Sequence, residues 1–225
     1  MRIVIVEDHA LTRDLLHLLC KRDLNHEVVG EAADGRQAVE VIIRCKPDLV
    51  LLDLHLPEYS GFCVAEIIRR AGCRPRILAL SSFCNDYTVY WIERIQFDGF
   101  VDKMASLVTN LQEAIATVAE GRAYFSDAYC KIKAARRQNP EAFEKVLTER
   151  EQRILAMIGD LLTDREIAER LEISGLTVEK HRSNMQRKLG LDNRTVLTRY
   201  AYQHGFTEAV GLNPDPSHHR ARTHA

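Results

Sequence analysis

Five short apolar runs, separated by helical patterns, constrain the fold of the first half of the chain more than any other feature. They are rich in Val, Ile and Leu and lie at Arg2–Glu7, Glu27–Glu31, Leu49–Asp53, Ile77–Ser81 and Gly99–Lys103. Each run is too short for a helix and is bounded by polar or turn residues, which favours five buried strands. Between the runs, apolar residues recur at the three- and four-residue spacing of a helix. This alternation predicts an α/β domain with a doubly wound, five-stranded parallel sheet covered by helices on both faces.

The distribution of charge suggests that the two halves of the chain have different partners. At 225 residues, the chain is long enough for two domains. Residues 1–125 hold 14 basic and 18 acidic side chains, whereas residues 145–204 hold 11 basic and 9 acidic ones, so the net charge changes from −4 to +2. An acidic pocket joined to a domain that binds a polyanion would give this split. Ordinary variation in charge explains it equally well.

The cysteines and the lack of long apolar runs indicate a cytoplasmic protein. None of the six cysteines belongs to a CxxC pair, and most lie in apolar stretches, where a thiol packs as a small apolar group. We therefore expect reduced thiols. The N-terminus has no basic segment followed by an apolar block, and no apolar run approaches the length of a membrane span. We expect no membrane partner.

Polar residues suited to metal and phosphate chemistry stand at the ends of four of the five runs. Glu7 and Asp8 end the first run, Asp53 the third, Ser81 the fourth and Lys103 the fifth. The carboxyl ends of parallel strands share one edge of a sheet, where ligands bind near the reversal of strand order. Three carboxylates gathered there repel one another, so the arrangement indicates a hard divalent cation such as Mg2+. A carboxylate could then attack phosphorus while the cation, Lys103 and Ser81 stabilise the oxygens of the transferred group.

Each of these residues alone has an ordinary structural explanation. Asp8 could cap the first helix, Asp53 could begin a turn, and Lys103 could be a solvated surface lysine. Their shared position at strand ends favours a functional site.

The fragments IVIVEDH, DLVLLDLHLPEYSG, ILALSS and GFVDK resemble the receiver domain of response regulators, over about residues 1–122. The resemblance implies that Asp53 is the phosphoacceptor and that Mg2+ is the cofactor. It further implies a set of metal ligands, namely Glu7, Asp8, Asp53 and the backbone carbonyl of His55. By the same resemblance, Lys103 and Ser81 contact the phosphoryl group.

The resemblance also assigns a conformational switch. Phe100 matches the aromatic switch position, which turns inward as the hydroxyl of Ser81 moves towards the phosphate; the alternative is a plain core aromatic on the fifth strand. Met104 follows the lysine, where many receivers have proline. The side chain of His55 occupies a variable position, and we expect it to be a bystander at the rim of the pocket.

The second half of the chain predicts an all-α domain of four helices. A linker covers Ser126–Pro140, and we expect it to be a solvated, partly helical connector with a basic cluster of Lys131, Lys133, Arg136 and Arg137. Two capping boxes, Thr148–Glu151 and Thr163–Glu166, each pair a hydroxyl N-cap with a glutamate three residues later and so begin a helix. Ser174 can cap a third helix that ends at Gly190, and Asp192 or Asn193 can open a fourth that runs to Gly205. The short connection between the second and third helices has the length of a helix-turn-helix turn.

The third helix has an apolar stripe and a basic outer face. The stripe consists of Leu176 or Thr177, Val178, His181, Met185 and Leu189. Residues 174–199 hold six basic and two acidic side chains. Such a helix suits the major groove of DNA, although a solvated face of a helical bundle has the same pattern.

The fragments LTEREQRIL, REIAERLEIS, TVEKHRSNMQRKLG and NRTVLTRYA resemble the LuxR-type DNA-binding domain, over about residues 145–205. The resemblance implies base contacts by Glu179, Lys180 and Ser183, and phosphate contacts by His181, Arg182, Arg187 and Lys188. It implies a dimer contact through the last helix, with Thr195, Leu197, Thr198, Ala201 and Tyr202. Glutamate at position 179, where lysine is frequent, departs from the pattern and should favour cytosine.

Together the two resemblances predict a response regulator of the NarL/FixJ type. We expect a receiver domain at 1–122, a linker at 123–144, a DNA-binding domain at 145–205 and a disordered tail at 206–225. The expected function is transcriptional regulation, not enzymatic turnover: a histidine kinase phosphorylates Asp53, and this controls dimerisation and promoter binding. In the family, the unphosphorylated receiver often covers the recognition helix or blocks dimerisation.

Two alternatives belong to other classes. A phosphatase with an aspartate nucleophile also uses a doubly wound sheet and Mg2+, but usually needs a second acid two residues after the nucleophile, where this chain has His55. A DNA-binding protein with a vestigial receiver would act without phosphorylation, but the complete set of pocket residues argues against it.

Overall fold

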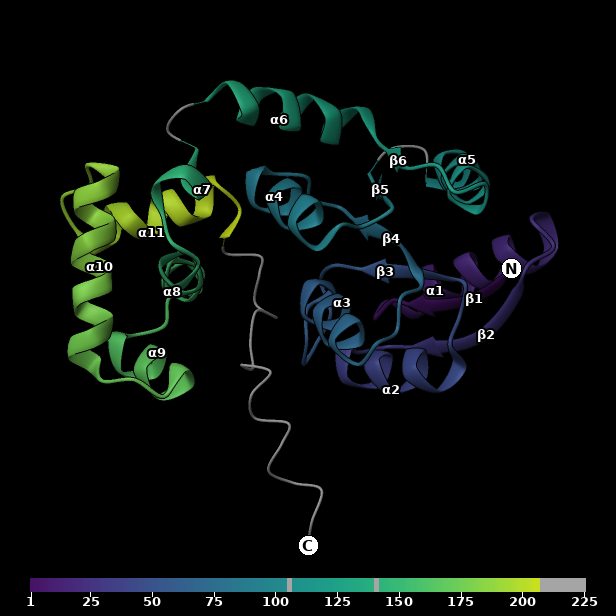
Figure 1. Ribbon diagram of the computed structural model, residues 1–225, viewed down its shortest axis with the longest axis horizontal. Coiled ribbons are helices and arrows are strands. Elements are labelled where there is room, and N and C mark those ends of the chain that lie inside the picture. The colour runs from purple at the N-terminus through teal and green to yellow at the C-terminus, as the bar shows by residue number, and fades with distance from the viewer. Residues whose placement is uncertain (105–106, 140–141, 207–225) are drawn as a thin grey trace, which may run out of the picture.

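The computed structural model describes residues 1–104, 107–139 and 142–206. The chain forms an α/β part followed by an all-helical part, with a helix spanning the two (Figure 1). The predicted disordered tail lies outside the described residues except for Phe206, which is buried. Within the described ranges, no helix combines the length and the apolar character needed to cross a membrane.

The α/β part contains a parallel sheet with strand order β2-β1-β3-β4-β5-β6. Its strands are β1 (Arg2–Val6), β2 (Glu27–Ala32), β3 (Leu49–Asp53), β4 (Arg76–Ser81), β5 (Gly99–Asp102) and β6 (Tyr124–Phe125). The five predicted strands are confirmed. The two-residue β6 adds a sixth at the edge, where Tyr124 pairs with Gly99 and Phe125 with Phe100. Strand order reverses between β1 and β3, which is where such sheets bind ligands.

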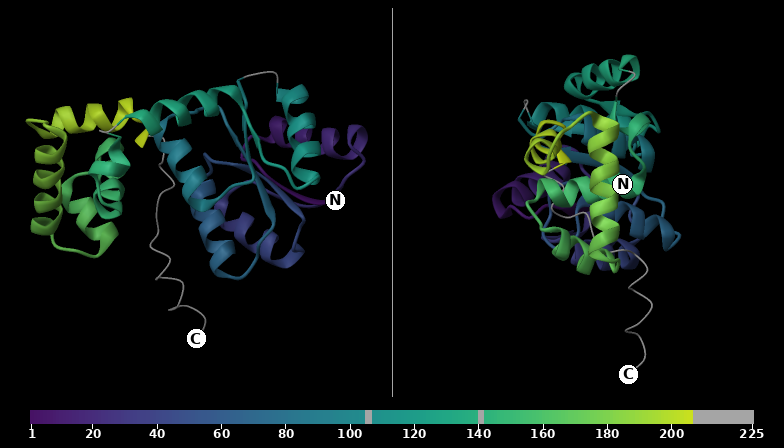
Figure 2. Two further views of the ribbon diagram at one scale, coloured as in Figure 1. Left: turned by 45° about the horizontal axis from the view of Figure 1, so that its top comes forward. Right: turned by 90° about the vertical axis from the view of Figure 1, so that its left-hand side faces the viewer.

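Helices cover both faces of the sheet, as predicted. They are α1 (Ala10–Leu18), which continues into the π-helical segment η1 (Leu19–Asp23), and α2 (Gly35–Cys45), α3 (Gly61–Arg70), α4 (Asp86–Ile95) and α5 (Leu107–Ala119). Successive residues of each strand point to opposite faces of the sheet and therefore belong to two separate hydrophobic cores. Ile3 and Leu49 pack with α1 and α5, whereas Val4 and Val50 pack with α2, α3 and α4. The two layers of helices are visible on either side of the sheet (Figure 2, left).

Gly61 places α3 directly behind the end of β3. A side-chain carbon at this position would overlap the backbone carbonyl of Asp53. Ser60 caps the helix by accepting a hydrogen bond from the backbone of Cys63. The glycine therefore allows the close approach that encloses Asp53.

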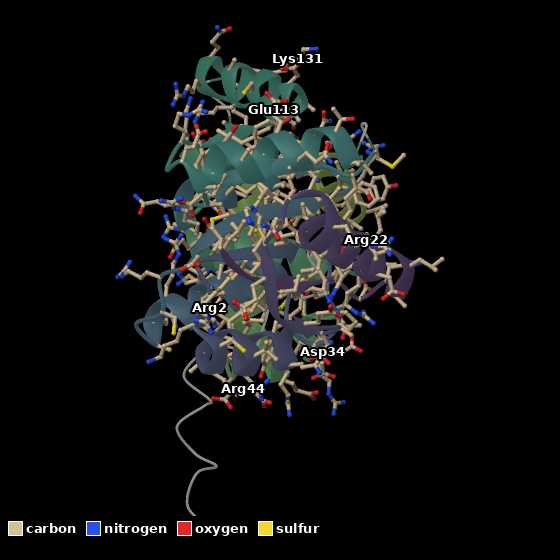
Figure 3. The ribbon with its side chains drawn as sticks, turned by 90° about the vertical axis from the view of Figure 1, so that its right-hand side faces the viewer. Arg2, Arg22, Asp34, Arg44, Glu113 and Lys131 are labelled. Carbon is tan, nitrogen blue, oxygen red and sulfur yellow. The ribbon has the colours of Figure 1, made fainter. Side chains whose placement is uncertain are left out.

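The segment expected to be a connector is largely structured. It contains β6, α6 (Asp127–Gln138) and α7 (Phe143–Val146). Helix α6 packs on α4, with Lys133 Nζ 2.9 Å from Glu93 Oε1. Arg136, predicted as part of a solvated basic cluster, is buried and pairs with Glu144 at 2.5 Å. By contrast, Lys131 of α6 points outward from the molecule, as does Glu113 of α5 (Figure 3).

The helical part has the four predicted helices, α8 (Glu149–Gly159), α9 (Asp164–Leu171), α10 (Gly175–Leu189) and α11 (Arg194–Gln203). Both capping boxes are present, with each glutamate returning to its threonine N-cap. Ser174 caps α10, and Gly190 ends it with a left-handed φ of 66°. The stripe of α10 is confirmed at Val178 and Met185, which are fully buried, but Leu176 is exposed.

Candidate functional site

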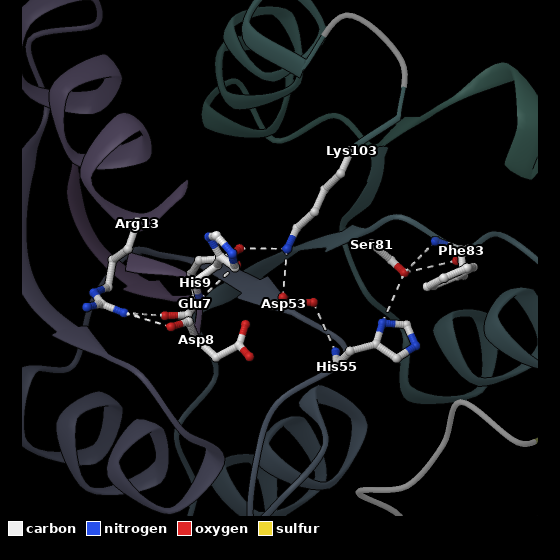
Figure 4. A network of polar contacts seen from close by, with 9 residues as sticks. All are labelled: Glu7, Asp8, His9, Arg13, Asp53, His55, Ser81, Phe83 and Lys103. Carbon is white, nitrogen blue, oxygen red and sulfur yellow. Dashed lines mark hydrogen bonds and ion pairs between the residues drawn. The ribbon is translucent and has the colours of Figure 1, made fainter. Parts of the chain in front are cut away.

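The carboxyl ends of β1, β3 and β5 bring one cation and three carboxylates together (Figure 4). Lys103 Nζ lies 2.6 Å from Asp53 Oδ2 and 2.6 Å from Glu7 Oε2. Oxygen atoms of Glu7, Asp8 and Asp53 all lie within 4.8 Å of one another. Glu7 and Asp53 are buried, whereas Asp8 is exposed. The pocket is thus closed on the side of the sheet and open to solvent at Asp8.

The electrostatics of this pocket favour an additional positive charge. Burial raises the pKa of Glu7, and the nearby charge of Asp53 raises it further, although Lys103 partly opposes both effects. Burial alone would lower the pKa of Lys103, but Asp53 and Glu7 outweigh it and raise that pKa. One ammonium group therefore faces an excess of carboxylates. The donor set consists of carboxylate oxygens, which a hard cation such as Mg2+ prefers.

Backbone contacts fix the remaining geometry of the acidic residues. The backbone N–H of His55 donates to Asp53 Oδ1 at 2.9 Å, and that of His9 donates to Glu7 Oε1 at 3.3 Å. Arg13 donates to the backbone carbonyls of Glu7 and Asp8, at 2.7 and 3.4 Å. Since backbone N–H groups hold the carboxylates of Asp53 and Glu7, these two carboxylates are positioned before any ligand binds.

Ser81 is turned towards the segment between β4 and α4. Its hydroxyl accepts from the backbone N–H of Phe83 and donates to the carbonyl of the same residue, each at 3.0 Å. His55 Nδ1 lies 3.3 Å from Ser81 Oγ, and the imidazole packs edge-on against Phe83. Burial lowers the pKa of His55, with Asp53 opposing and Lys103 adding to this effect. The side chain of His55 is therefore part of the pocket wall. His55 was expected at the rim of the pocket as a bystander, and its contacts with Ser81 and Phe83 were not predicted.

Phe100 is fully buried in the α/β core. Its ring lies 5.8 Å from that of Tyr129 on α6, which in turn stacks on Phe125 at 4.4 Å. The inward position fits both the switch and the core-aromatic interpretations. The cover provided by Tyr129 was not predicted, because it depends on the docking of α6.

The outer face of α10 is exposed, as a DNA-reading helix requires. Glu179, Lys180, Ser183 and Arg187 are all exposed, and His181 is half-buried. The α/β part therefore does not cover these residues. Of the two arrangements expected from the family, a receiver that covers the recognition helix is not the one in this structure, and a receiver that blocks dimerisation stays a prediction.

Two of the four residues assigned to phosphate contacts already have acidic partners. Lys188 Nζ lies 2.7 Å from Glu151 Oε2, and Arg182 lies 3.1 Å from Asp164 Oδ2. The other oxygen of Asp164, Oδ1, pairs with Arg194. Glu151 is the capping-box glutamate of α8, and Asp164 is the first residue of α9. These ion pairs join α10 to its neighbours within the helical part.

The residues of α11 that were assigned to a dimer contact fall into a buried group and a more exposed group. Leu197 and Ala201 are fully buried in the core, so they cannot face a second chain and this part of the prediction is wrong. Thr195 and Tyr202 are exposed, and Thr198 is half-buried. Together with Leu161 they line an open, largely apolar groove of about 710 Å³.

Comparison with known families accounts for both parts of the chain. The family described as the response regulator receiver domain matches residues 3–116, and the luxR family of bacterial regulatory proteins matches residues 145–201. The fold and the acidic pocket thus define a phosphorylation-regulated protein with a DNA-binding domain. The chain belongs to the LuxR-type response regulators of two-component systems, which regulate transcription.

Individual relatives agree with this assignment over most of the chain. The response regulator protein VraR of Staphylococcus aureus is 30% identical over 209 residues, which are 92% of this chain and 99% of that protein. A LuxR-family response regulator from Aurantimonas sp. SI85-9A1 is 29% identical over 61% of this chain and 98% of that one, with a TM-score of 0.57. A complex of the response regulator RcsB with DNA covers 90% of this chain and 98% of that one, at 20% identity and a TM-score of 0.60, and shows the shared fold.

Proposed function

We propose that Asp53 is the phosphoacceptor of this regulator and that its phosphorylation, by a histidine kinase, controls DNA binding through α10. The observation that carries the proposal is the contact of Lys103 with both Asp53 and Glu7 at the strand ends. It fixes an ammonium group beside the nucleophilic carboxylate. The carboxylate is held in place by the N–H of His55.

The residues of the pocket support phosphoryl transfer to Asp53. In that step a carboxylate oxygen of Asp53 forms a bond to phosphorus, and the bond from phosphorus to the donor breaks. Lys103 would neutralise charge on the transferred oxygens, and the hydroxyl of Ser81 would donate to one of them after leaving Phe83. Glu7, Asp8, Asp53 and the carbonyl of His55 would hold Mg2+, which supplies charge stabilisation at the phosphoryl group.

The pocket supports a regulator rather than a hydrolase that turns over a separate substrate. The position two residues after Asp53 holds His55 in place of a second acid. Its imidazole lies against Ser81 and Phe83, and burial lowers its pKa, so it is poorly suited to protonate a leaving group. We also propose a cytoplasmic location, where the kinase and the DNA are both accessible.

We propose that Glu179, Lys180 and Ser183 read bases, because they are exposed on the outer face of α10. Arg187 on the same helix would contact a phosphate. Thr195, Thr198 and Tyr202 would form the dimer contact on α11. We also propose a receiver domain at residues 1–122, a linker at 123–144 and a DNA-binding domain at 145–205. Within the linker, β6 and α6 extend the receiver at its edge.

The acceptor assignment can be tested by labelling the full-length protein with acetyl phosphate and Mg2+, followed by mass spectrometry of the intact chain. We expect one phosphoryl group on the wild type and on Asp14→Asn, which removes an exposed carboxylate of α1. Asp53→Asn should remain unlabelled. Label that persists in Asp53→Asn would overturn the assignment.

A further inference from the structure

Leu176, on the first turn of α10, is an apolar side chain that faces solvent. It is 78% exposed, whereas Val178 and Met185 of the same helix are fully buried. An α-helix has about 3.6 residues per turn, so Leu176 and Met185 are separated by about two and a half turns and lie on opposite sides of α10. The leucine is therefore not part of the core of the DNA-binding domain, and its apolar surface is available to a ligand.

The same face of α10 carries the residues proposed to read bases. Glu179, Lys180 and Ser183 follow Leu176 at spacings of three, four and seven residues, which place side chains on one side of a helix. All three are exposed, as Leu176 is. The base-reading face thus begins with one apolar side chain and continues with polar ones.

The start of α10 is open to a large ligand. A side-chain carbon added to Gly175, which precedes Leu176, would meet open space among the described residues. Seen from the side of the DNA-binding domain, α10 runs across the front of the molecule (Figure 2, right). A DNA duplex can therefore approach Leu176 as closely as it approaches Lys180.

The first turn of α10 is held in place by its cap. Ser174 Oγ accepts a hydrogen bond from the backbone N–H of Thr177 at 3.1 Å and lies 2.8 Å from Thr177 Oγ1. These two contacts bracket Leu176 in sequence and fix the backbone that carries it. Little backbone entropy is then lost when Leu176 contacts a ligand, because the turn is already ordered.

The chemistry of leucine limits what Leu176 can recognise in the major groove. Its side chain has no charge and no hydrogen-bond donor or acceptor, so it cannot pair with a phosphate or with the polar edges of the bases. The C5-methyl group of thymine is the apolar feature that this groove presents, and proteins recognise it by apolar contact. Such a contact removes apolar surface of both partners from water, which stabilises the complex.

We propose that Leu176 is a specificity-determining residue that packs against the C5-methyl group of a thymine in the operator. The proposal rests on the proposed reading of bases by α10. Leu176 and Lys180 are four residues apart, or about 6 Å along the helix axis. This is less than two base-pair steps of about 3.4 Å each, so the thymine lies within two base pairs of the position that Lys180 reads.

Uracil tests the contact because it lacks only the methyl group and keeps every hydrogen-bonding atom of thymine. Each thymine of one half-site would be replaced in turn by uracil in a duplex identified from the genomic fragments that the protein binds. The affinity of the full-length protein would be measured under the condition, treated with acetyl phosphate or untreated, that gives the tighter binding. We expect one replacement to weaken binding of the wild type by about fourfold, which is the contribution of one buried methyl group.

Variants of Leu176 assign the effect to this side chain. Leu176→Ala should bind the thymine and the uracil duplex equally, and Leu176→Met, which keeps a long apolar side chain, should retain most of the preference for thymine. Leu11→Ala removes a leucine of α1 that is 76% exposed, and it should behave like the wild type.

Three results would overturn the proposal. They are a preference for thymine that is unchanged in Leu176→Ala, equal binding of every uracil duplex by the wild type, and a sensitive thymine more than two base pairs from the position read by Lys180. A loss of dimer in Leu176→Ala by sedimentation velocity, with the preference unchanged, would place a second chain on this leucine instead. Failure of the proposed base reading would look different, because Lys180→Ala would then weaken cognate and scrambled duplexes equally.

Discussion

Lys188, near the end of α10, is ion-paired with Glu151, the capping-box glutamate of α8, at 2.7 Å. The carboxylate of Glu151 is 4% exposed and also accepts from the backbone and hydroxyl of Thr148. Although burial by itself raises the pKa of Glu151, the bonds to Lys188 and Thr148 lower it overall. The lysine thus joins two helices of the DNA-binding domain, in addition to any contact with DNA.

Replacement of Lys188 by Ala should therefore destabilise the DNA-binding domain. Loss of the ammonium group leaves a buried carboxylate with hydroxyl and amide donors only, at a cost of about 1–3 kcal/mol in the free energy of unfolding. Arg187→Ala, at the neighbouring exposed position, should leave stability unchanged and reduce the slope of log affinity against log salt by about one unit. Urea unfolding and salt-dependent DNA titrations of both variants check this. Equal stability of the two variants would contradict the structural role of Lys188.

Lys180→Ala should impair sequence recognition. Its side chain is exposed near the start of α10, where side chains reach base edges. We expect a loss of about 1–3 kcal/mol on the cognate duplex and weaker discrimination at one base pair. Lys131→Ala, which removes an exposed positive charge from α6, serves as the control. An equal loss on cognate and scrambled duplexes would mean that Lys180 contributes only charge.

Asp160→Asn should flatten the dependence of stability on pH. Burial raises the pKa of Asp160 from 3.8 to about 7, with Arg170 opposing. The folded protein therefore holds this proton more tightly than the unfolded chain, and the stabilising contribution, present below about pH 4, is lost as the pH rises through 7. The variant should gain stability relative to the wild type between pH 5 and about 8, as measured by thermal unfolding. Asp192→Asn, at an exposed position, should show no such gain. A parallel pH profile for Asp160→Asn and the wild type would refute the assignment.

Tyr202→Glu should weaken dimerisation of the phosphorylated protein. Tyr202 is 72% exposed and lines the apolar groove beside α11, so a charge there would have to be buried in a dimer. Gln203→Glu changes an adjacent exposed residue by the same charge. Sedimentation velocity should show a larger loss of dimer for Tyr202→Glu, and an equal effect of both changes would exclude the groove from the interface.

Local sequence chemistry predicted the parts of the structure that depend on neighbours in the chain. The strand-end positions of Asp53 and Lys103 followed from short apolar runs, and both capping boxes followed from a hydroxyl and a glutamate three residues apart. The strand β6 was missed because two residues carry no periodicity, and its pairing with β5 depends on the assembled sheet.

These local patterns could not predict contacts between residues that are far apart in the sequence. Glu151 and Lys188 are 37 positions apart, and no motif links them. Leu197 and Ala201 were assigned to a dimer contact by position in the family, whereas their spacing of four on α11 is also that of a helix face in the core. The docking of α6 on α4 and of Phe206 on Tyr87 required the fold of both domains.

The central claim is that phosphorylation of Asp53 controls DNA binding, and a binding titration of the full-length protein tests it most directly. An operator duplex would first be identified from the genomic fragments that the protein binds. The affinity of the protein for this duplex would then be measured with and without acetyl phosphate and Mg2+. We predict that treatment raises the affinity of the wild type at least about tenfold, equivalent to about 1.4 kcal/mol, and leaves Asp53→Asn unchanged. Equal affinity of treated and untreated wild type, with Asp53 shown to be labelled, would contradict the account.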